Sequence, residues 1–502
     1  MEKYVITLDE GTTSARTVIV NKKSEIVSID QKEFTQYFPQ PGWVEHDPVE
    51  IWNTQRTTLI NAVNKLGVKI DQIDSIGITN QRETAVVWDR ESGTPIYNAI
   101  VWQDKRKDNY VENFTQEQID SIREKTGLMV NPYFSASKVA WILDNIKGAR
   151  KSAEEGKLAF GTINTWLIYR LTGGKEFLTD HTNAQRTLLY NINTNTWDDE
   201  LLKLFNIPRS MLPEIRDCGS DFGETFANLF SKTDPSRIKI RSSIGDQQSA
   251  LFGQMCIKEG EVKSTYGTGC FILMNTGNKK VFSKHGILTT IALAKDGKIT
   301  YALEGSVMIA GAVTQWLRDN LRVIYNSLET EWYSEQVEDD RPVYFVPSFQ
   351  GLGSPYWDNT SRGAIFGLDR GTKREHIVRA AIESIAYQAN DVIDAMQKDL
   401  NTKLKIIKVD GGASRNNHLM QFQADISQTT VNRPANTETT AMGAAYIAGL
   451  HTKYWTSEEE IEKNIKNDKI FKNKMPLEVA NKKIKGWKSA VSRTFSWTIE
   501  TE

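Results

Sequence analysis

Two short segments of the chain combine glycine with hydroxyl side chains in a way that suits phosphate binding. In the first, residues 8–14 have the sequence LDEGTTS. Backbone N–H groups and hydroxyls in such a turn can contact phosphate oxygens, and the carboxylate of Asp9 at the strand end can hold Mg²⁺ through water. The same residue types also favour ordinary hairpin turns. Phosphate binding and a plain hairpin turn are therefore both open for this segment.

The second segment, residues 266–269, has the sequence YGTG and is another candidate phosphate turn. Further along, residues 409–414 have the sequence VDGGAS, in which glycines after a strand would let the backbone approach a flat ligand such as adenine. A plain strand-to-helix turn is the alternative. The chain has no G-x4-G-K-[ST] segment, so a bound nucleotide would be held in another way.

Two further places could handle an alcohol substrate. Asp246 follows a bend of small residues, and its carboxylate could accept the proton of a hydroxyl that attacks a phosphoryl group. Most aspartates in such loops are caps or turn formers. Arg82 and Glu83 follow a predicted strand directly and could grip neighbouring hydroxyls of a polyol as a paired donor and acceptor. An exposed ion pair is the alternative for these two residues.

Strands and helices must position these residues. Hydrophobic alternation predicts strands around the first turn and further strands after it, and a 3.6-residue period predicts an amphipathic helix between them. The predicted elements of this part are strands 4–9, 16–20, 26–29, 73–79 and 84–88 and a helix at 48–66. Residues 105–235 are expected to be mainly helical.

The second half repeats the opening pattern of the first. Residues 261–271 again read as strand, Gly/Thr turn and strand, and a second hairpin follows at 286–294 and 299–304. Helices are expected near 310–328 and 376–400, and a strand at 405–409. These repeats predict two similar α/β halves that face each other across a catalytic cleft, with a border near Gly253: an N-terminal domain at 1–253 and a C-terminal domain at 254–502.

Composition excludes several other classes of protein. The 502 residues include 62 Lys and Arg and 63 Asp and Glu, a formal charge of −1, which gives no long-range attraction to nucleic acid or anionic membranes. Three cysteines are too few for a disulfide framework. No apolar run approaches the roughly 20 residues of a membrane-spanning helix, and the chain enters a strand pattern at once, with no room for a signal peptide. We expect a cytoplasmic protein with no nucleic-acid partner and no membrane insertion.

These motifs together resemble the FGGY family of sugar kinases, within the actin-like (ribonuclease H-like) ATPase fold superfamily. Residues 133–145, YFSASKVAWILDN, resemble the first family signature, and residues 363–368, GAIFGL, with 376–383 resemble the second. The resemblance extends from about Tyr4 to Gly449 and implies ATP as phosphoryl donor with Mg²⁺ as cofactor.

Segments 41–47, 80–84 and 101–104 further resemble the members that phosphorylate glycerol to glycerol 3-phosphate. Glycerol and ATP are thus the expected substrates, and relatives are commonly homodimers or homotetramers. A kinase for another small polyol or ketose is the alternative within the fold. A nucleotide-driven actin-like binding protein is the alternative from another class.

The resemblance also implies roles for individual residues. Asp246 would be the general base, and Asp9 and Asp246 would lie at the Mg²⁺. The residues expected at the polyol are Arg82, Glu83, Trp102, Tyr133, Asp246, Gln247 and Phe271. The residues expected at the nucleotide are Thr12, Thr13, Ser14, Arg16, Thr268, Gly311, Gln315, Gly412 and Asn416.

Overall fold

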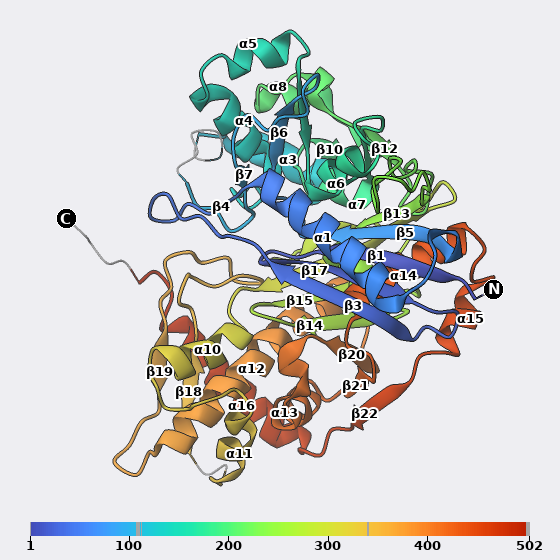
Figure 1. The fold of residues 1–502 in the computed structure, drawn as a ribbon. Helices are drawn as coiled ribbons and strands as arrows, with labels where there is room; N and C mark the ends of the chain where they lie inside the picture. Colours follow the sequence, from blue (N-terminus) through green and yellow to red (C-terminus); the bar gives the residue numbers. More distant parts are fainter. Residues whose placement is uncertain (1, 107–110, 112, 339–340, 498–502) are drawn as a thin grey trace. The chain divides into compact units, whose positions relative to one another are not determined.

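The computed structural model describes residues 2–106, 111, 113–338 and 341–497. The chain folds into two compact units (Figure 1). Unit 1 comprises Met1–Met255, Thr290–Tyr301 and Thr439–Asn464, and unit 2 comprises Cys256–Thr289, Ala302–Glu438 and Ile465–Glu502. Each unit is built around its own mixed β-sheet.

The sheet of unit 1 has five strands in the order β13-β5-β1-β2-β3. Strand β1 pairs antiparallel with β2 and parallel with β5, and β5 pairs parallel with β13. The strands are β1 (Tyr4–Glu10), β2 (Ser14–Val20), β3 (Ile26–Glu33), β5 (Ile73–Asn80) and β13 (Ile240–Gly245). The main helices are α1 (Pro48–Leu66), α6 (Ile163–Leu171), α9 (Asp246–Gly253) and α14 (Thr439–His451).

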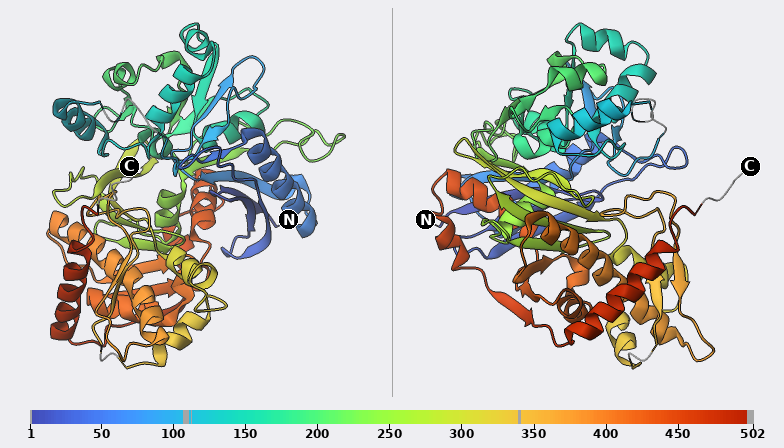
Figure 2. Two further views of the ribbon diagram at one scale, coloured as in Figure 1. Left: turned by 90° about the vertical axis from the view of Figure 1, so that its left-hand side faces the viewer. Right: turned by 180° about the vertical axis from the view of Figure 1, so that it is seen from behind.

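Helices cover both faces of this sheet, because successive side chains of each strand point to opposite faces. On β1, Ile6 and Leu8 join the hydrophobic core that contains residues of α1. Between them, the Thr7 hydroxyl donates to the carbonyl of Ala441 on α14 (2.8 Å). In Figure 2 the blue helix α1 and the orange-red helix α14 lie on either side of the blue strands. Helix α14 comes so close to β5 that a Cβ on Gly77 would lie 2.5 Å from a backbone oxygen.

The remainder of unit 1 carries shorter elements. They are β4 (Glu45–His46), β6 (Val86–Asp89), β7 (Ala99–Ile100), α3 (Gln116–Thr126), α4 (Ser135–Asn145), α5 (Ala149–Glu154), β8 (Leu158–Gly161), β9 (Leu178–Asp180), α7 (His181–Gln185), β10 (Tyr190–Asn191), β11 (Thr196–Trp197), α8 (Asp199–Leu204), β12 (Glu214–Arg216) and α15 (Glu458–Glu462). The described part of residues 105–235 thus contains the expected helices but also five strands, each two to four residues long. Strands this short show no readable alternation, so the sequence pattern did not reveal them.

The sheet of unit 2 has the order β16-β17-β15-β14-β20-β21-β22, and the hairpin residues 290–301 are grouped with unit 1. Its strands are β14 (Val262–Tyr266), β15 (Cys270–Gly277), β16 (Leu288–Lys295), β17 (Lys298–Val307), β20 (Ile406–Asp410), β21 (Thr430–Pro434) and β22 (Asn467–Phe471), with a separate pair β18 (Tyr344–Val346) and β19 (Ala364–Phe366). Its helices are α10 (Gly311–Asp319), α11 (Glu329–Glu335), α12 (Arg374–Leu400), α13 (Asn417–Ser427) and α16 (Leu477–Ser492).

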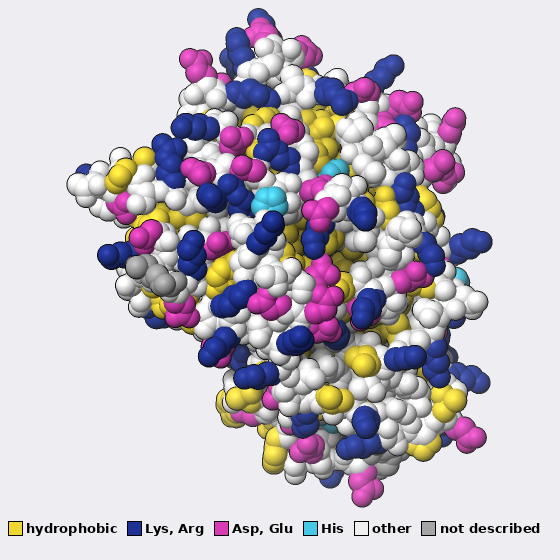
Figure 3. All heavy atoms as spheres, turned by 90° about the vertical axis from the view of Figure 1, so that its right-hand side faces the viewer, with side chains coloured by type: hydrophobic (Ala, Val, Ile, Leu, Met, Phe, Trp, Pro, Cys, Tyr) yellow, Lys and Arg dark blue, Asp and Glu magenta, His cyan; other side chains and the backbone are white. Residues whose placement is uncertain are grey.

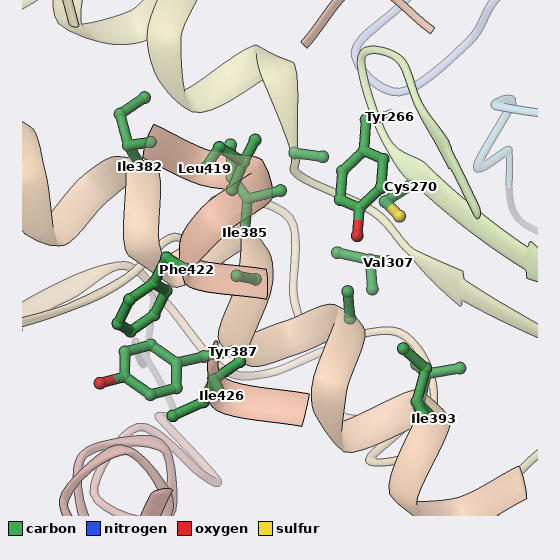
Figure 4. Packing of buried hydrophobic residues seen from close by; sticks show 14 of the residues in the cluster. Tyr266, Cys270, Val307, Ile382, Ile385, Tyr387, Ile393, Leu419, Phe422 and Ile426 are labelled. Carbon is green, nitrogen blue, oxygen red and sulfur yellow. The ribbon is translucent and has the colours of Figure 1, made fainter. Parts of the chain in front are cut away.

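Helix α12 forms the centre of the unit 2 core. Its side chains Ile382, Ile385 and Tyr387 pack with Leu419 and Phe422 of α13 (Figure 4). The ring of Tyr387 also stacks on Trp487 of α16, with centroids 5.1 Å apart. Helix α16 is the dark red helix of Figure 2. The floor of the candidate site described below is therefore the outer layer of a large hydrophobic core.

Most expected elements are confirmed, including both Gly/Thr hairpins and the helix at 48–66. The helix expected to reach residue 328 ends at Asp319 instead. There the N–H of Leu321 bonds back to the carbonyl of Trp316 (3.0 Å), and Arg322 takes a positive φ of 57°. A reversal of this kind ends a helix. The prediction from hydrophobic spacing alone extended the helix beyond this point. Strand β22, in the lysine-rich tail, was not predicted.

The surface carries charges of both signs. On the face shown in Figure 3, Lys and Arg side chains alternate with Asp and Glu side chains and form no large patch of one sign. Within the described ranges, every helix is too short or too polar to cross a lipid bilayer.

Candidate functional site

The first Gly/Thr turn joins β1 to β2 in unit 1. Its backbone closes tightly, since the N–H of Gly11 donates to the carbonyl of Ser14 (3.0 Å). Asp9 and Arg16 are direct cross-strand partners, and their side chains form an ion pair of 3.0 Å between Oδ2 and Nη2. Thr13 at the tip is exposed. The hairpin therefore presents hydroxyls beside a carboxylate–guanidinium pair.

Three parallel strands bring the remaining unit 1 residues to this same edge. Glu10 at the end of β1 is in register with Asn80 on β5, and Asn80 with Gly245 on β13. The residues that follow these strands, Arg82 and Asp246, consequently emerge side by side. Burial raises the pKa of the Glu10 carboxyl well above its ordinary value.

We call Arg82, Glu83, Trp102, Tyr133, Asp246 and Gln247 the unit 1 cluster. The carboxylate of Asp246 receives Arg82 Nε at 3.1 Å and two donors of Gln247, the backbone N at 2.7 Å and Nε2 at 3.0 Å. The Arg82 side chain is 2% exposed and that of Asp246 29% exposed. Asp246 is thus held in one orientation while part of it remains open to solvent.

Glu83 has a left-handed backbone conformation, which its neighbours hold in place. Its φ is +63°, which costs about 1–3 kcal/mol for a residue other than glycine. The hydroxyl of Ser135, at the start of α4, donates to its carbonyl (2.7 Å). Its carboxylate pairs with Arg186, whose side chain is fully buried. These contacts fix Glu83 beside Arg82 Nε, 3.9 Å away.

Two aromatic rings complete the cluster. Trp102 and Tyr133 meet edge to face with centroids 5.5 Å apart, and the guanidinium of Arg186 lies over the Tyr133 ring (5.6 Å). Trp102 Nε1 donates to the hydroxyl of Thr12 in the first turn (3.0 Å). The cluster and the first Gly/Thr turn therefore form one continuous surface of unit 1.

This arrangement suits proton removal from an alcohol and binding of its hydroxyls. Among the described residues, no group of three or more His, Cys, Asp or Glu side chains gathers in a way that could hold a metal ion. Mg²⁺ is usually bound by one or two carboxylates together with substrate phosphates and water. Asp9 and Asp246, at the ends of β1 and β13, meet that smaller requirement.

Unit 2 contains a cavity of about 430 Å³ around its own Gly/Thr turn, within the range of small-ligand sites. All five residues that were expected at the nucleotide in this half line this cavity. They are Thr268, Gly311, Gln315, Gly412 and Asn416.

Backbone contacts hold the turn of unit 2 against the start of α10. The N–H groups of Ala310 and Ala312 both donate to the carbonyl of Thr268 (2.8 and 3.1 Å). Gly311 donates to the carbonyl of Gly267 (2.9 Å), and a Cβ on Gly311 would lie 2.6 Å from that oxygen. The position therefore requires glycine, and the turn is rigid.

The cavity has an apolar floor and polar ends. Ile382, Ile385 and Leu419 form the floor. Asn416 accepts from the N–H of Leu419 (2.9 Å) and caps α13. A Cβ on Gly412 would meet no protein atom within 4 Å, so packing does not require glycine there. This shape suits a flat ring lying against the glycine.

Several lining residues escaped the sequence analysis. In unit 1 these are Arg186 and Gln248, and in unit 2 Ser327, Leu328, Thr330, Glu331 and Arg415. Arg415 is the one basic residue in the described lining of the cavity, and it immediately precedes Asn416, so proximity to the glycine turn could have identified it. The others come from distant segments and leave no local signal.

Phe271, expected at the polyol, lies on β15 in unit 2. Its proposed contact with the polyol stays a prediction.

The chain matches two adjacent family descriptions. Residues 4–253 match the N-terminal domain of the FGGY family of carbohydrate kinases, and residues 262–451 match its C-terminal domain. It is 64% identical over 502 residues to a glycerol kinase of Mycoplasma capricolum subsp. capricolum, covering 100% of this chain and 99% of the relative. It is 54% identical over 505 residues to a glycerol kinase of Mycoplasmoides gallisepticum, with the same coverage.

A solved structure agrees in fold and sequence. The crystal structure of Plasmodium falciparum glycerol kinase with ADP is similar with a TM-score of 0.90 and 39% identity, covering 98% of each chain. Full-length identity, two matched domains and two mixed sheets lead to one assignment: the chain belongs to the FGGY family of carbohydrate kinases.

Proposed function

We propose that this protein transfers the γ-phosphoryl group of ATP to glycerol and releases glycerol 3-phosphate and ADP. The observation that carries the choice of glycerol is the identity of 54–64% over the whole chain to relatives named glycerol kinase. The geometry of the unit 1 cluster supports it, since an exposed carboxylate lies beside fixed donors and acceptors.

Recognition of glycerol would rest on hydrogen bonds, because a three-carbon polyol offers little apolar area. Arg82, Glu83 and Asp246 would bind its hydroxyls, together with Gln247 and Tyr133. Trp102 and Phe271 would pack against its carbon atoms. Leaving such a buried partner unpaired costs about 1–3 kcal/mol, which would discriminate against an analogue that lacks one hydroxyl.

Asp246 would act as the general base. Its carboxylate would take the proton of the attacking hydroxyl while that oxygen forms a bond to the γ-phosphorus and the bond to the β–γ bridging oxygen breaks. Arg82 Nε and the two donors of Gln247 would hold the carboxylate in one orientation.

The nucleotide would be bound by residues of both units. In unit 1, Thr12, Thr13, Ser14 and Arg16 would contact phosphate oxygens. In unit 2, Thr268, Gly311 and Gln315 would contact the phosphates. Gly412 and Asn416 would contact the adenosine. Bound Mg²⁺ would neutralise phosphate charge, with Asp9 and Asp246 as its protein ligands. We accordingly propose residues 1–253 as the polyol domain and 254–502 as the adenosine domain.

The test is ADP release by the purified protein with Mg-ATP and one acceptor at a time. We expect glycerol to exceed dihydroxyacetone, xylulose and gluconate in kcat/KM by about 10²-fold or more, in line with rejection of analogues by a hydrogen-bonding site. Asp246→Ala protein, prepared identically, controls for contaminating kinases. Turnover of a ketose with none of glycerol would overturn the proposal. The cytoplasmic location and the oligomeric state stay predictions.

A further inference from the structure

Outside the unit 1 cluster, the carboxylate of Asp180 is fully buried at the junction of β9 and α7. Its Oδ1 caps α7 and accepts from the N–H groups of Thr182 (2.8 Å) and Asn183 (3.2 Å) and from the Thr182 hydroxyl. Its Oδ2 accepts from Asn164 Nδ2 (3.1 Å), Asn183 Nδ2 (2.7 Å) and Ser243 Oγ (2.9 Å). Both oxygens are therefore surrounded by donors, and the mechanism proposed above uses none of these residues.

The donors around Asp180 are all uncharged amides and hydroxyls. Taking a carboxylate out of water is costly unless its charge is compensated, and burial accordingly raises the pKa of Asp180. A neutral Asn or Ser caps a helix about as well as Asp does. Capping of α7 alone thus does not account for a carboxylate at this position, and the explanation lies in where its other hydrogen bonds lead.

One chain of hydrogen bonds leads from Asp180 to Asp246. The Thr182 hydroxyl donates its single proton to Asp180, and a lone pair of the same oxygen accepts from the N–H of Gly245 (2.9 Å). Gly245 ends β13 and directly precedes Asp246. The stem of Arg82 lies on this same residue, since a Cβ on Gly245 would come within 2.8 Å of Arg82 Cδ. The first chain therefore fixes the backbone from which Asp246 emerges.

A second chain leads from Asp180 to Arg82. The Nδ2 of Asn183 donates to Asp180 and also to Asn80 Oδ1 (3.1 Å), and Asn80 Nδ2 donates back to Asn183 Oδ1 (3.0 Å). Asn80 Nδ2 also donates to the carbonyl of Gln81 (2.6 Å), the residue before Arg82. Because the carboxylate only accepts, it turns the nitrogen of the Asn183 amide towards itself, and that amide in turn orients Asn80. The second chain therefore fixes the backbone from which Arg82 emerges.

We infer that Asp180 is a positioning residue for phosphoryl transfer, which through these two chains holds Asp246 Oδ1 and Arg82 Nε at their separation of 3.1 Å. The inference rests on the function proposed above for these two residues. The first chain acts on the general base and so on kcat. The second chain acts on a residue that binds the acceptor and so on the KM for glycerol. A displacement of about 1 Å in such a site lowers the rate by up to about 10²-fold.

Thr182→Val tests the first chain, because valine has the shape of threonine without the hydroxyl. We expect kcat with glycerol to fall about tenfold or more, with a KM for glycerol within about twofold of the wild-type value. Thr182→Ser restores the hydroxyl and should restore kcat. Here kcat is expressed per nucleotide site, counted by calorimetric titration with ADP in the absence of Mg²⁺, so that unfolded protein does not contribute.

Two variants test the second chain. Asn80→Ala removes both amide contacts and should raise the KM for glycerol about tenfold, while kcat and the KM for ATP stay near the wild-type values. Asp180→Asn keeps an oxygen that caps α7 and accepts from Thr182, but it turns an NH₂ group against Nδ2 of Asn183. It should therefore act like Asn80→Ala. A mere loss of folded protein would lower turnover without raising the KM for glycerol.

Asp198→Asn is the matched control, because Asp198 caps α8 in the same unit by accepting from the N–H groups of Glu200 and Leu201 (both 3.0 Å). It should leave kcat per site and both KM values unchanged, whatever its effect on stability. All variants are measured with the acceptor that the wild type phosphorylates best, so rejection of glycerol overturns the proposed function and not this inference. Wild-type kcat in Thr182→Val, or a wild-type KM for the acceptor in Asn80→Ala and Asp180→Asn, would overturn the inference.

Discussion

The unit 1 cluster and the unit 2 cavity differ in how many charged side chains they contain and in how these are paired. In the cluster, buried arginines meet carboxylates directly, as in the pairs Arg82–Asp246 and Arg186–Glu83. In the cavity the floor is apolar, and the one described acidic lining residue, Glu331, is occupied by donors of Asn417 (2.7 and 2.9 Å). The first arrangement fixes the direction of a few polar atoms. The second provides area for a flat ring, with little fixed charge.

The largest effect should come from the cluster. Asp246→Ala removes the carboxylate that would take the hydroxyl proton, and general-base catalysis is worth about 10²–10⁴-fold. We expect kcat with glycerol to fall by about 10³-fold, measured by ADP release. Gln247→Ala removes the Nε2 donor to that carboxylate but keeps the backbone N–H and the base, and it should retain far more activity. Full activity of the Asp246 variant would remove it as the base.

Arg82→Ala should act on the acceptor. The KM for glycerol should rise by about 10–100-fold, because each lost hydrogen bond to a charged group is worth about 1.5–3 kcal/mol. The KM for ATP should change little. Arg82→Lys keeps the charge but lacks the guanidinium fork. Its KM for glycerol should lie between those of the wild type and Arg82→Ala. A glycerol KM equal to that of the wild type would contradict the role assigned to Arg82.

Asp391 in unit 2 is a buried carboxylate that, unlike those of the unit 1 cluster, forms no ion pair with an arginine among the described residues. Burial raises the pKa of Asp391 to about 6, while its hydrogen bonds come from Trp487 (2.6 Å) and Tyr356 (2.9 Å). Folded Asp391 keeps its proton up to about pH 6, whereas the unfolded chain ionises near pH 4. Its contribution to stability is complete below pH 4 and is lost as the pH rises through 6.

Asp391→Asn should therefore stabilise the protein at pH 7 by about 2 kcal/mol relative to its effect at pH 4. Urea unfolding at several pH values measures this difference. Asp394→Asn, one turn away on α12 with a side chain 39% exposed, is the control. A pH-independent effect of the Asp391 variant would contradict the assignment.

Two glycines separate turn geometry from ligand contact in the cavity. Gly311→Ala places a Cβ 2.6 Å from the Gly267 carbonyl and should both destabilise the protein and weaken ATP binding. Gly412→Ala meets no protein atom within 4 Å, so it should leave thermal stability unchanged but raise the KM for ATP about tenfold (about 1.4 kcal/mol). Equal loss of stability in both variants would show that Gly412 is structural.

The smallest effect concerns Arg415. As the one described basic residue lining the cavity, it should contact the nucleotide from an exposed position, where such contacts contribute about 1 kcal/mol or less. Arg415→Ala should raise the KM for ATP about fivefold and leave the KM for glycerol unchanged. Added salt should reduce the difference from the wild type. A wild-type KM for ATP at low salt would exclude the contact.

The sequence predicted those parts of the site whose signals are local. The turns at Asp9–Ser14 and Gly267–Gly269 are each set by neighbouring residues, and their hairpins were recognised from alternation and glycine. Arg186, by contrast, supports Glu83 across 103 positions of the chain. Thr330 and Glu331 reach the cavity only because the preceding helix ends at Asp319, a reversal that hydrophobic spacing did not reveal. The resemblance to the family, rather than periodicity, selected Arg82 and Asp246 from many similar residues.

The most direct test of the contrast between the two regions is to measure ADP affinity and turnover in the same proteins. Calorimetry without Mg²⁺ gives the Kd for ADP, and ADP release at saturating Mg-ATP and glycerol gives kcat, for the wild type, Asp246→Ala and Gly412→Ala. We predict that Asp246→Ala keeps a wild-type Kd and loses turnover, while Gly412→Ala loses affinity and keeps most of its kcat. If both variants lose affinity and turnover together, acceptor chemistry and adenosine binding do not reside in separate regions.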